Sequence, residues 1–404
     1  MTSQADGLRP SLATLKDRIA ERVDALADQL VEASHAIHTD PELGFEEHRT
    51  AGRLVSLLGA DARFTVETGI AGLATAFRAS LVGRQPGPTV AILAEYDALP
   101  RVGHACGHNI ICTSAVGAGL ALATIVDQLA GTIQVVGTPA EEGGGGKILM
   151  LQRGAFDPVD AALIMHPSRQ THVCPRMLGM RSLRMEFRGT SAHGAQSPHE
   201  GRSALGAVIQ TFSAIDTLRQ HIRMDARIHG IITHGGEKPS VIPEYAACHF
   251  YVRAADDGYL DELMERVLNC ARGAALSTGT QVQVLDPEFP AYQPYLPNQV
   301  IAEHYARNVE ALGERVNQVD EHYVYASNDI GNVSRRLPVT AMMFGISRAA
   351  SLADHSREFA EAAASPLGDR ALLLAAKSQA MTVADMLAEP AIVAQAKAEL
   401  TAAA

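Results

Sequence analysis

The sequence predicts an α/β protein in which a largely parallel sheet, flanked by helices, is interrupted by a smaller inserted α+β domain. Short apolar runs at 89–94, 132–137, 161–165 and 339–345 alternate with helical patterns, which is typical of parallel strands buried on both faces. Residues from about 176 to 288 instead follow the order β-α-β-β-α-β of a ferredoxin-like module. We therefore expect a larger domain formed by residues 1–175 and 289–404, split by an insert at 176–288.

The larger domain is expected to begin with helices. Apolar residues recur at three- and four-residue spacing from Leu12 to Leu30, which predicts one amphipathic helix. The polar stretch 38–47 contains Pro and Gly and predicts a loop, and a second helix follows to about residue 58. The alanine-rich segment from Ala391 onward predicts a final surface helix.

The insert shows the alternating pattern of strands with one exposed face. Strands are predicted at 183–187, 227–233, 245–253 and 281–285, and helices at 203–222 and 259–275.

Composition excludes several classes of protein. The chain has 404 residues, with 34 Lys and Arg against 45 Asp and Glu, and a formal charge of −11, which argues against nucleic acid or an anionic membrane as the main partner. No stretch approaches the ~18 apolar residues of a membrane span, and the N-terminal residues do not resemble a secretory signal. Five irregularly spaced cysteines do not form a disulfide pattern, so a reducing, cytoplasmic location is expected.

Chemically capable residues follow the predicted strands. All four apolar runs are followed within about ten residues by His, Cys, Asp or Glu. In a parallel sheet the ligand crevice lies beyond the carboxyl ends of the strands. The sequence therefore predicts a functional site at that edge.

A cysteine and two histidines form the first cluster. His104, Cys106 and His108 alternate in a glycine-containing turn, and thiolate and imidazole are the ligands that zinc and related metals prefer. By itself, the cluster is also compatible with a buried free cysteine beside hydrogen-bonded histidines.

Carboxylates form the next clusters. Asp97 could orient a ligating histidine or could cap a helix or turn. Glu141 and Glu142, followed by four glycines, could divide the roles of base and metal ligand or could form a solvated acidic turn. His166 and His355 are unremarkable singly, but together with the other clusters they supply enough donors for two metals.

Five motifs in register identify a resemblance. His-x-x-Pro-Glu-Leu-Gly-Phe at 38–45, Asp-Ala-Leu-Pro at 97–100, His-Ala-Cys-Gly-His at 104–108, Pro-Ala-Glu-Glu at 139–142 and the insert occur in a known order. The chain resembles the metal-dependent amidohydrolases and peptidases of the aminoacylase and carboxypeptidase G family. Within this family it looks like the branch that contains auxin-conjugate amidohydrolases and p-aminobenzoyl-glutamate hydrolase, and it looks closest to the latter and to related dipeptidases acting on β-alanyl-lysine-type peptides.

The resemblance implies an aminopeptidase-like catalytic domain with two divalent ions. Their ligands would be Cys106, His108, Glu142, His166 and His355. Glu141 would be the general base and Asp97 an orienting residue. The Cys106 thiolate favours zinc, with manganese or cobalt as alternatives. Many relatives have a metal-binding histidine where this chain has Glu95.

The resemblance also implies that the insert is a dimerisation lid, so a homodimer is expected. His193, in the Gly-Thr-Ser-Ala-His-Gly motif, would stabilise the oxyanion in the partner's cleft, although alone it reads as a surface histidine. Ser240 stands where the family usually has a substrate-binding Asn, and Ser203 also replaces a frequent Asn. Arg253 could bind a substrate carboxylate or form a structural ion pair, and Asn328 could line the cleft or belong to a turn.

The expected reaction is hydrolysis of the amide bond of a small N-acyl or aminobenzoyl amino acid or dipeptide. One alternative is a metal hydrolase that releases ammonia from an aromatic amine or amidine; a nucleobase-type zinc deaminase is disfavoured because the Pro-Cys-x-x-Cys element is absent. A second alternative is a non-catalytic dimeric metal- or ligand-binding protein. The intact Glu141 speaks against it, because a binder needs no base.

Overall fold

The computed structural model describes residues 10–319 and 326–403, which divide into two compact units. The first unit comprises Met1–Pro175, Leu296–Tyr323 and Asn332–Ala404, and the second unit comprises Arg176–Tyr295 and Val324–Gly331. The second unit extends beyond the predicted insert at 176–288. Backbone hydrogen bonds explain the extension, because Tyr292 pairs with Met180 in both directions.

A seven-stranded mixed sheet forms the centre of the first unit, in the order β1-β2-β4-β3-β5-β13-β6. The four predicted strands β3, β4, β5 and β13 lie together and pair in parallel, which confirms the predicted sheet at its centre. The antiparallel strands β1, β2 and β6, which the apolar runs did not reveal, make the sheet mixed. The strands are β1 Thr65–Thr68, β2 Phe77–Val82, β3 Gln85–Glu95, β4 Ala130–Thr138, β5 Ala161–Ser168, β6 His172–Val173 and β13 Val339–Gly345.

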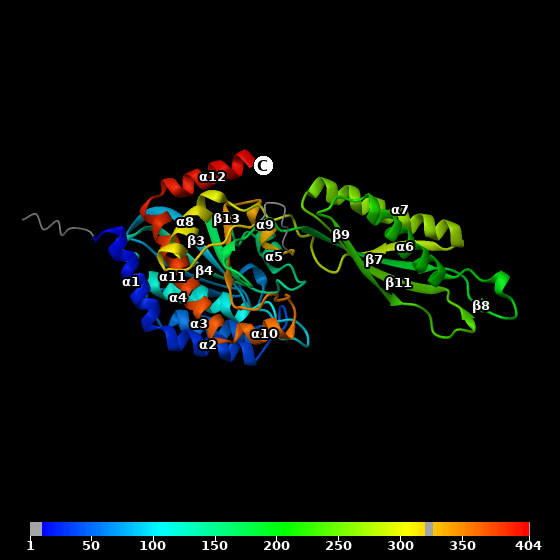
Figure 1. The fold of residues 1–404 in the computed structure, drawn as a ribbon, viewed down its shortest axis with the longest axis horizontal. Coiled ribbons are helices and arrows are strands. Elements are labelled where there is room, and N and C mark those ends of the chain that lie inside the picture. Colours follow the sequence, from blue (N-terminus) through cyan, green and yellow to red (C-terminus); the bar gives the residue numbers. More distant parts are fainter. Residues whose placement is uncertain (1–9, 320–325, 404) are drawn as a thin grey trace, which may run out of the picture. The chain divides into compact units, whose positions relative to one another are not determined.

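Helices flank this sheet (Figure 1). They are α1 Leu12–Ala25, α2 Ala27–Thr39, α3 His48–Gly59, α4 His108–Leu122, α5 Gly146–Gln152, α8 Gln299–Ala311, α10 Arg357–Ala363, α11 Pro366–Ala388 and α12 Ala391–Ala403, while α9 Ile330–Ser334 crosses the boundary between the units. The entirely buried helix α4 packs against α11 and β3. Gly117 permits the close approach of α4 to α2 and α11, because a Cβ there would lie 2.7 Å from Leu30 and 3.2 Å from Ala376.

Two helical predictions need correction. The stripe from Leu12 to Leu30 is divided into two helices at Leu26, whose φ and ψ of −99° and 0° depart from the helical values. His38 and Thr39 belong to α2 rather than to the predicted loop, which begins at Asp40. A ring nitrogen of His38 donates to the carbonyl of Ala360, and this distant contact is not visible in local sequence.

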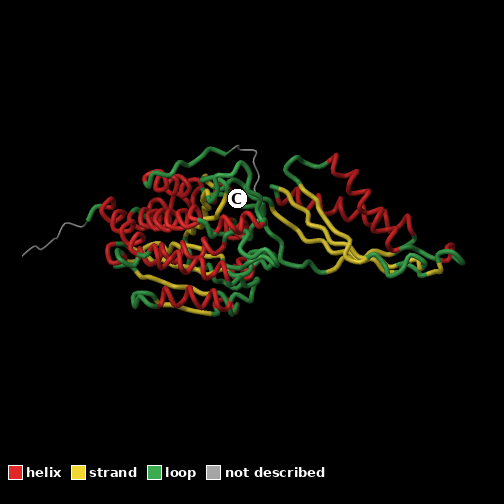
Figure 2. The backbone as a smooth tube through the Cα atoms, turned by 60° about the horizontal axis from the view of Figure 1, so that its bottom comes forward, coloured by secondary structure: helices red, strands yellow, loops and turns green. Residues whose placement is uncertain are grey.

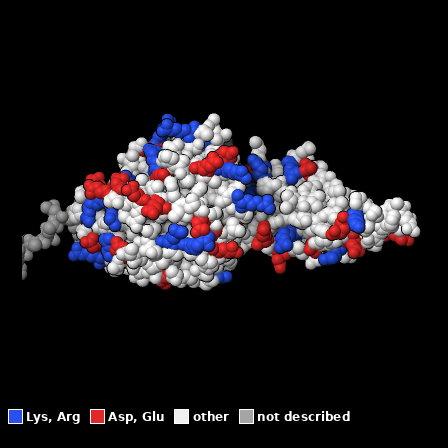
Figure 3. Space-filling view, turned by 90° about the horizontal axis from the view of Figure 1, so that it is seen from below, with Lys and Arg blue, Asp and Glu red and all other residues white. Residues whose placement is uncertain are grey.

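Helix α11 is long and apolar enough to span a membrane by composition. However, 78% of its most apolar window is buried within the protein, as expected of a core helix. On the face drawn in Figure 3, acidic and basic side chains lie next to one another.

The second unit is an antiparallel four-stranded sheet, in the order β12-β7-β11-β9, with two helices on one face (Figure 2). Its elements are β7 Gly179–Arg188, α6 Ala204–Leu218, β9 Arg227–His234, β11 Tyr245–Ala254, α7 Asp257–Thr278 and β12 Gln281–Leu285. The order along the chain confirms the predicted ferredoxin-like module. Phe187, Phe250 and Leu263 form part of the core between sheet and helices. The short strands β8 Ala192–His193 and β10 Val241–Ile242 form a separate pair.

Candidate metal centre

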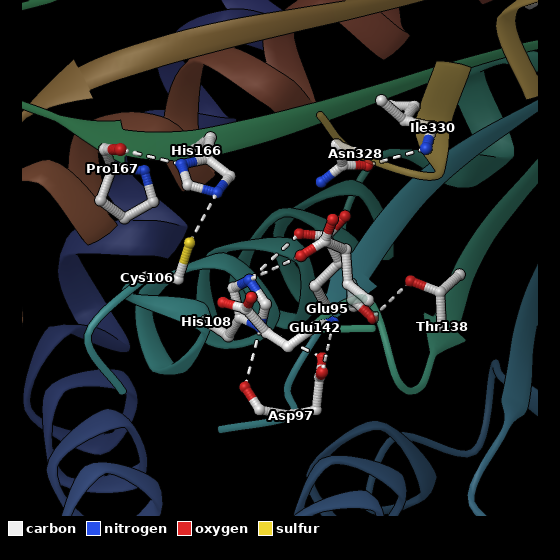
Figure 4. A network of polar contacts seen from close by, with 12 residues as sticks. Glu95, Asp97, Cys106, His108, Thr138, Glu142, His166, Pro167, Asn328 and Ile330 are labelled. Atoms are coloured by element: carbon white, nitrogen blue, oxygen red, sulfur yellow. Dashed lines mark hydrogen bonds and ion pairs between the residues drawn. The ribbon is translucent and has the colours of Figure 1, made fainter. Parts of the chain in front are cut away.

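The predicted ligands of the first unit converge where the parallel strands end (Figure 4). Glu95 is the last residue of β3, His166 lies in β5, and His108 begins α4. The Glu141–Glu142 pair follows β4, and His355 follows β13. This convergence agrees with the general position of ligand sites in α/β sheets.

His108 is held with one ring nitrogen directed toward the other ligands. Gly107 precedes it with φ of 74°, and this left-handed turn brings the chain against Pro167, which a Cβ at Gly107 would contact at 2.6 Å. The Nδ1–H of His108 donates to the carbonyl of Asp97 at 2.8 Å and lies 3.2 Å from Asp97 Oδ1. Its buried Nε2 makes no hydrogen bond among the described residues. This is the arrangement of a metal-binding histidine, oriented by a carbonyl and a carboxylate.

Cys106 lies between two further histidines. His166 uses Nδ1–H to donate to the carbonyl of Pro167 at 2.8 Å, and its Nε2 lies 3.6 Å from the Cys106 Sγ. The Nε2 of His355 lies 3.8 Å from the same sulfur and 3.6 Å from Glu142 Oε1. His355 has φ of 62°, and its N–H donates to the carbonyl of Ala105 at 3.0 Å.

These side chains form two donor groups that share Cys106. The groups are Cys106–His108–His166 and Cys106–Glu142–His355, and in each the donor atoms lie within 4.8 Å of one another. Thiolate, imidazole and carboxylate together suit zinc and related divalent metals. The buried Glu142 Oε1, like His108 Nε2, has no hydrogen-bond partner in the described chain, so the residues fit a pair of cations.

The turn that carries Glu141 and Glu142 is fixed by two buried carboxylates. Glu47 Oε1 accepts from the N–H of Ala140, whose φ is 56°, and Asp97 Oδ2 accepts from the N–H of Glu142, each at 2.8 Å. Sequence reasoning did not single out Glu47, because its partner lies far along the chain. A signal was present, since a second glutamate follows the polar 38–45 motif directly before a helix.

Burial and like charges shape the ionisation of the site. Burial, together with Glu142 and Glu141, raises the pKa of the Cys106 thiol well above its usual value. Burial disfavours a charged His108, but Asp97 and Glu95 outweigh it and raise the His108 pKa to about 9. Burial also raises the pKa of Glu142. Burial and the neighbouring carboxylates therefore both disfavour the Cys106 thiolate, and bound cations would favour it.

The remaining predicted residues belong to the second unit. His193 is exposed in β8, and its Nδ1 accepts from the N–H groups of Ala195 and Gln196 at 3.3 and 3.2 Å. The exposed Ser240 accepts the N–H of Gly194 through its carbonyl at 2.8 Å.

Arg253 and Asn328 are also positioned within the second unit. Arg253 Nη1 donates to Ser327 Oγ at 3.2 Å. The buried Asn328 accepts the N–H of Ile330 at 2.7 Å (Figure 4).

Comparison with known proteins identifies related sequences and structures. The family model described as peptidase family M20/M25/M40 matches residues 87–378. The chain is 36% identical to a Xaa-Arg dipeptidase of Mus musculus, over 94% of this chain and 91% of that protein. It is 30% identical to one of the subunits of p-aminobenzoyl-glutamate hydrolase from Escherichia coli, over 92% of this chain and 93% of that protein. A dinuclear metal-binding M20 peptidase of Bacillus subtilis has the same fold, with a TM-score of 0.70 and 22% identity over 90% of this chain and 99% of that one.

Proposed function

The chain belongs to peptidase family M20/M25/M40, and from this premise we propose that it hydrolyses the amide bond of a small N-acyl amino acid, aminobenzoyl amino acid or dipeptide. The observation that carries the proposal is the pair of donor groups sharing Cys106, with Glu141 beside them. A dipeptidase and an aminobenzoyl-glutamate hydrolase among the relatives support this substrate class.

We infer that the two donor groups hold two divalent ions per subunit. The ligands are Cys106, His108, Glu142, His166 and His355, and the thiolate favours zinc over manganese or cobalt. When bound, such ions polarise the scissile carbonyl and acidify a bound water toward a pKa of ~7. Asp97 orients His108 and the Glu142 backbone.

Glu141 is proposed as the general base. Its carboxylate is almost entirely buried, and Oε2 lies 3.9 Å from His108 Nε2, so it borders the first donor group without hydrogen bonding to this imidazole. Glu141 accepts the proton of the attacking water and returns it to the leaving nitrogen.

His193 of a second copy is proposed to stabilise the oxyanion, in a homodimer formed through the second unit. Its Nδ1 accepts two backbone N–H groups, so the neutral ring carries its proton on Nε2. This exposed N–H is a donor of the kind that stabilises developing negative charge.

Substrate binding is proposed to involve Arg253, Ser240 and Asn328. A guanidinium is suited to bind the carboxylate of an amino acid product in a bidentate manner. We expect the enzyme to act in the cytoplasm, as predicted from its cysteine usage.

One experiment tests the proposal. The purified protein is incubated, with and without a chelator, with aminobenzoyl-glutamate, N-acyl amino acids, β-alanyl dipeptides, dipeptides ending in arginine, and aryl amines, and products are identified by mass spectrometry. We expect chelator-sensitive amide cleavage. Ammonia release without amide cleavage would instead favour a deaminating hydrolase, and absence of any turnover would favour a binding protein.

The matched variant is Glu141→Gln. It should lose turnover by roughly 10²–10⁴-fold, as expected for a general base, while its metal content stays that of the wild type. Full activity of this variant would contradict the mechanism.

A further inference from the structure

A buried ion pair adjoins the proposed metal centre at His108. Lys147, in the first turn of α5, and Glu95, at the end of β3, are both completely buried, and Lys147 Nζ lies 2.6 Å from Glu95 Oε1. Lysine is almost never fully buried unless it is paired. This pair has no role in the mechanism above, although Glu95 Oε2 lies 3.5 Å from His108 Nε2.

Glu95 belongs to a third potential donor group. Glu95, His108 and Glu141 place their donor atoms within 4.8 Å of one another, as the two groups containing Cys106 do. His108 takes part both in this group and in the group with Cys106 and His166. Because its Nδ1–H is engaged by Asp97, His108 offers a metal only Nε2. The two groups therefore compete for one nitrogen and cannot both use it for different ions.

Which of the two groups binds the ion decides whether Glu141 is free of the metal and can act as the general base. An ion held by Glu95, His108 and Glu141 would use the Glu141 carboxylate as a ligand, and it would leave the thiolate of Cys106 with one ion instead of two. A carboxylate that already balances a buried ammonium is a poorer ligand, because coordination must displace that ion pair.

We propose that Lys147 is a positioning residue that holds Glu95 out of the coordination sphere, so that the ion at His108 is bound with Cys106 and His166 and Glu141 remains available as base. This inference rests on the proposed metal-dependent function. It assigns a role to the lysine that follows the four glycines of the 143–146 loop.

The test uses cobalt-substituted protein, in which thiolate-to-cobalt charge transfer reports the metals bound to Cys106. Lys147→Met removes the ammonium with little change in side-chain length. We expect this variant to bind two ions per subunit, as the wild type does, but with its charge-transfer absorption reduced by about half, because one of two metal–thiolate bonds is lost. The double variant Glu95→Gln/Lys147→Met, which has no carboxylate at position 95, should regain the wild-type spectrum.

The outcomes separate this inference from the function on which it rests. Two bound ions with an unchanged spectrum in Lys147→Met would overturn the role of Lys147, as would a double variant that keeps the altered spectrum. If Lys147→Met does not fold, the same measurement on Lys147→Gln, which keeps a hydrogen-bond donor without the charge, decides the question. A wild-type protein that binds no ions, or shows no thiolate band, would instead contradict the proposed metal centre.

Discussion

Replacing Glu47 by Gln should make the metal-free protein more stable at pH 8 but not at pH 5. Glu47 is fully buried and accepts hydrogen bonds from the Ala140 N–H and the Thr75 hydroxyl, each at 2.8 Å. Glutamine can preserve both contacts, because its oxygen accepts from Ala140 while its amide donates to the Thr75 hydroxyl. The substitution therefore removes the charge and keeps the local structure.

The magnitude follows from the ionisation of Glu47. Burial, reinforced by the charge of Asp97, raises its pKa from 4.5 to about 7. Between these values the folded protein retains a proton that the unfolded chain has released, so the free energy of unfolding falls as the pH rises through this window. The stabilisation is complete below pH 4.5 and is lost above about pH 7. The pKa difference corresponds to about 3 kcal/mol at most, of which roughly 2–3 kcal/mol falls between pH 5 and pH 8.

The assay is urea unfolding of chelator-treated protein at pH 5, 6, 7 and 8. Circular dichroism is the suitable probe, because the chain contains no tryptophan. The stability of Glu47→Gln relative to the wild type should increase steadily with pH. Glu47→Ala is the matched control, since it removes the charge and also the acceptor for Ala140, and it should cost about 1–3 kcal/mol relative to Glu47→Gln at every pH. A difference between Glu47→Gln and the wild type that is the same at pH 5 and pH 8 would refute the reasoning.

Three further predictions concern the metals and His193. Asp97→Ala should weaken metal binding by about 10–100-fold, because it removes the carboxylate that contacts His108 Nδ1 and accepts from the Glu142 N–H, while only the backbone carbonyl still holds His108; chelator competition that matches the wild type would contradict this. His193→Ala should lower kcat by about 10²–10³-fold with unchanged metal content; unchanged kcat would exclude a role in oxyanion stabilisation. Adding zinc to the metal-free protein at about 100 times the wild-type Kd should raise the free energy of unfolding by about 2.7 kcal/mol per site, and Cys106→Ser should gain less at the same zinc concentration because it binds zinc more weakly. An equal gain in Cys106→Ser would exclude the thiolate as a ligand.

The resemblance identified the five proposed ligands, and their convergence was predictable to the extent that they follow the parallel strands of one sheet. The apolar runs predicted β3, β4, β5 and β13. Because ligands in such sheets bind beyond the carboxyl ends of the strands, the side chains that follow these strands could be expected to lie close together. The antiparallel strands β1 and β2 were not predicted. β1 has four largely exposed residues, and β2 alternates buried with exposed or half-buried residues, so neither forms a continuous apolar run.

The residues that support the ligands were not predictable in the same way. Glu47 acts on Ala140 and Lys147 acts on Glu95, and each contact joins segments that are distant in sequence. In local sequence Glu47 is one of several acidic residues before a helix, and Lys147 reads as a solvent-exposed lysine after a flexible loop. Only the tertiary structure shows that both are buried. A buried charged group must be paired or hydrogen-bonded, so each of the two fixes the position of its partner.

Asp97 links the two donor groups before any ion binds. Its backbone carbonyl and Oδ1 orient His108, which belongs to one group, while Oδ2 holds the backbone of Glu142, which belongs to the other. Glu47 fixes the opposite end of the same turn through Ala140. These contacts keep the ligands oriented for the metals, but they also bring several buried carboxylates close together. The positive charges of Lys147 and His108 balance only part of this negative charge. Burial raises the pKa values of both Glu47 and Glu142, and the charge of Asp97 adds to the increase. Divalent cations would balance the remaining negative charge, so metal binding and the stability of the first unit should be thermodynamically coupled, and chelation should weaken the first unit more than the second.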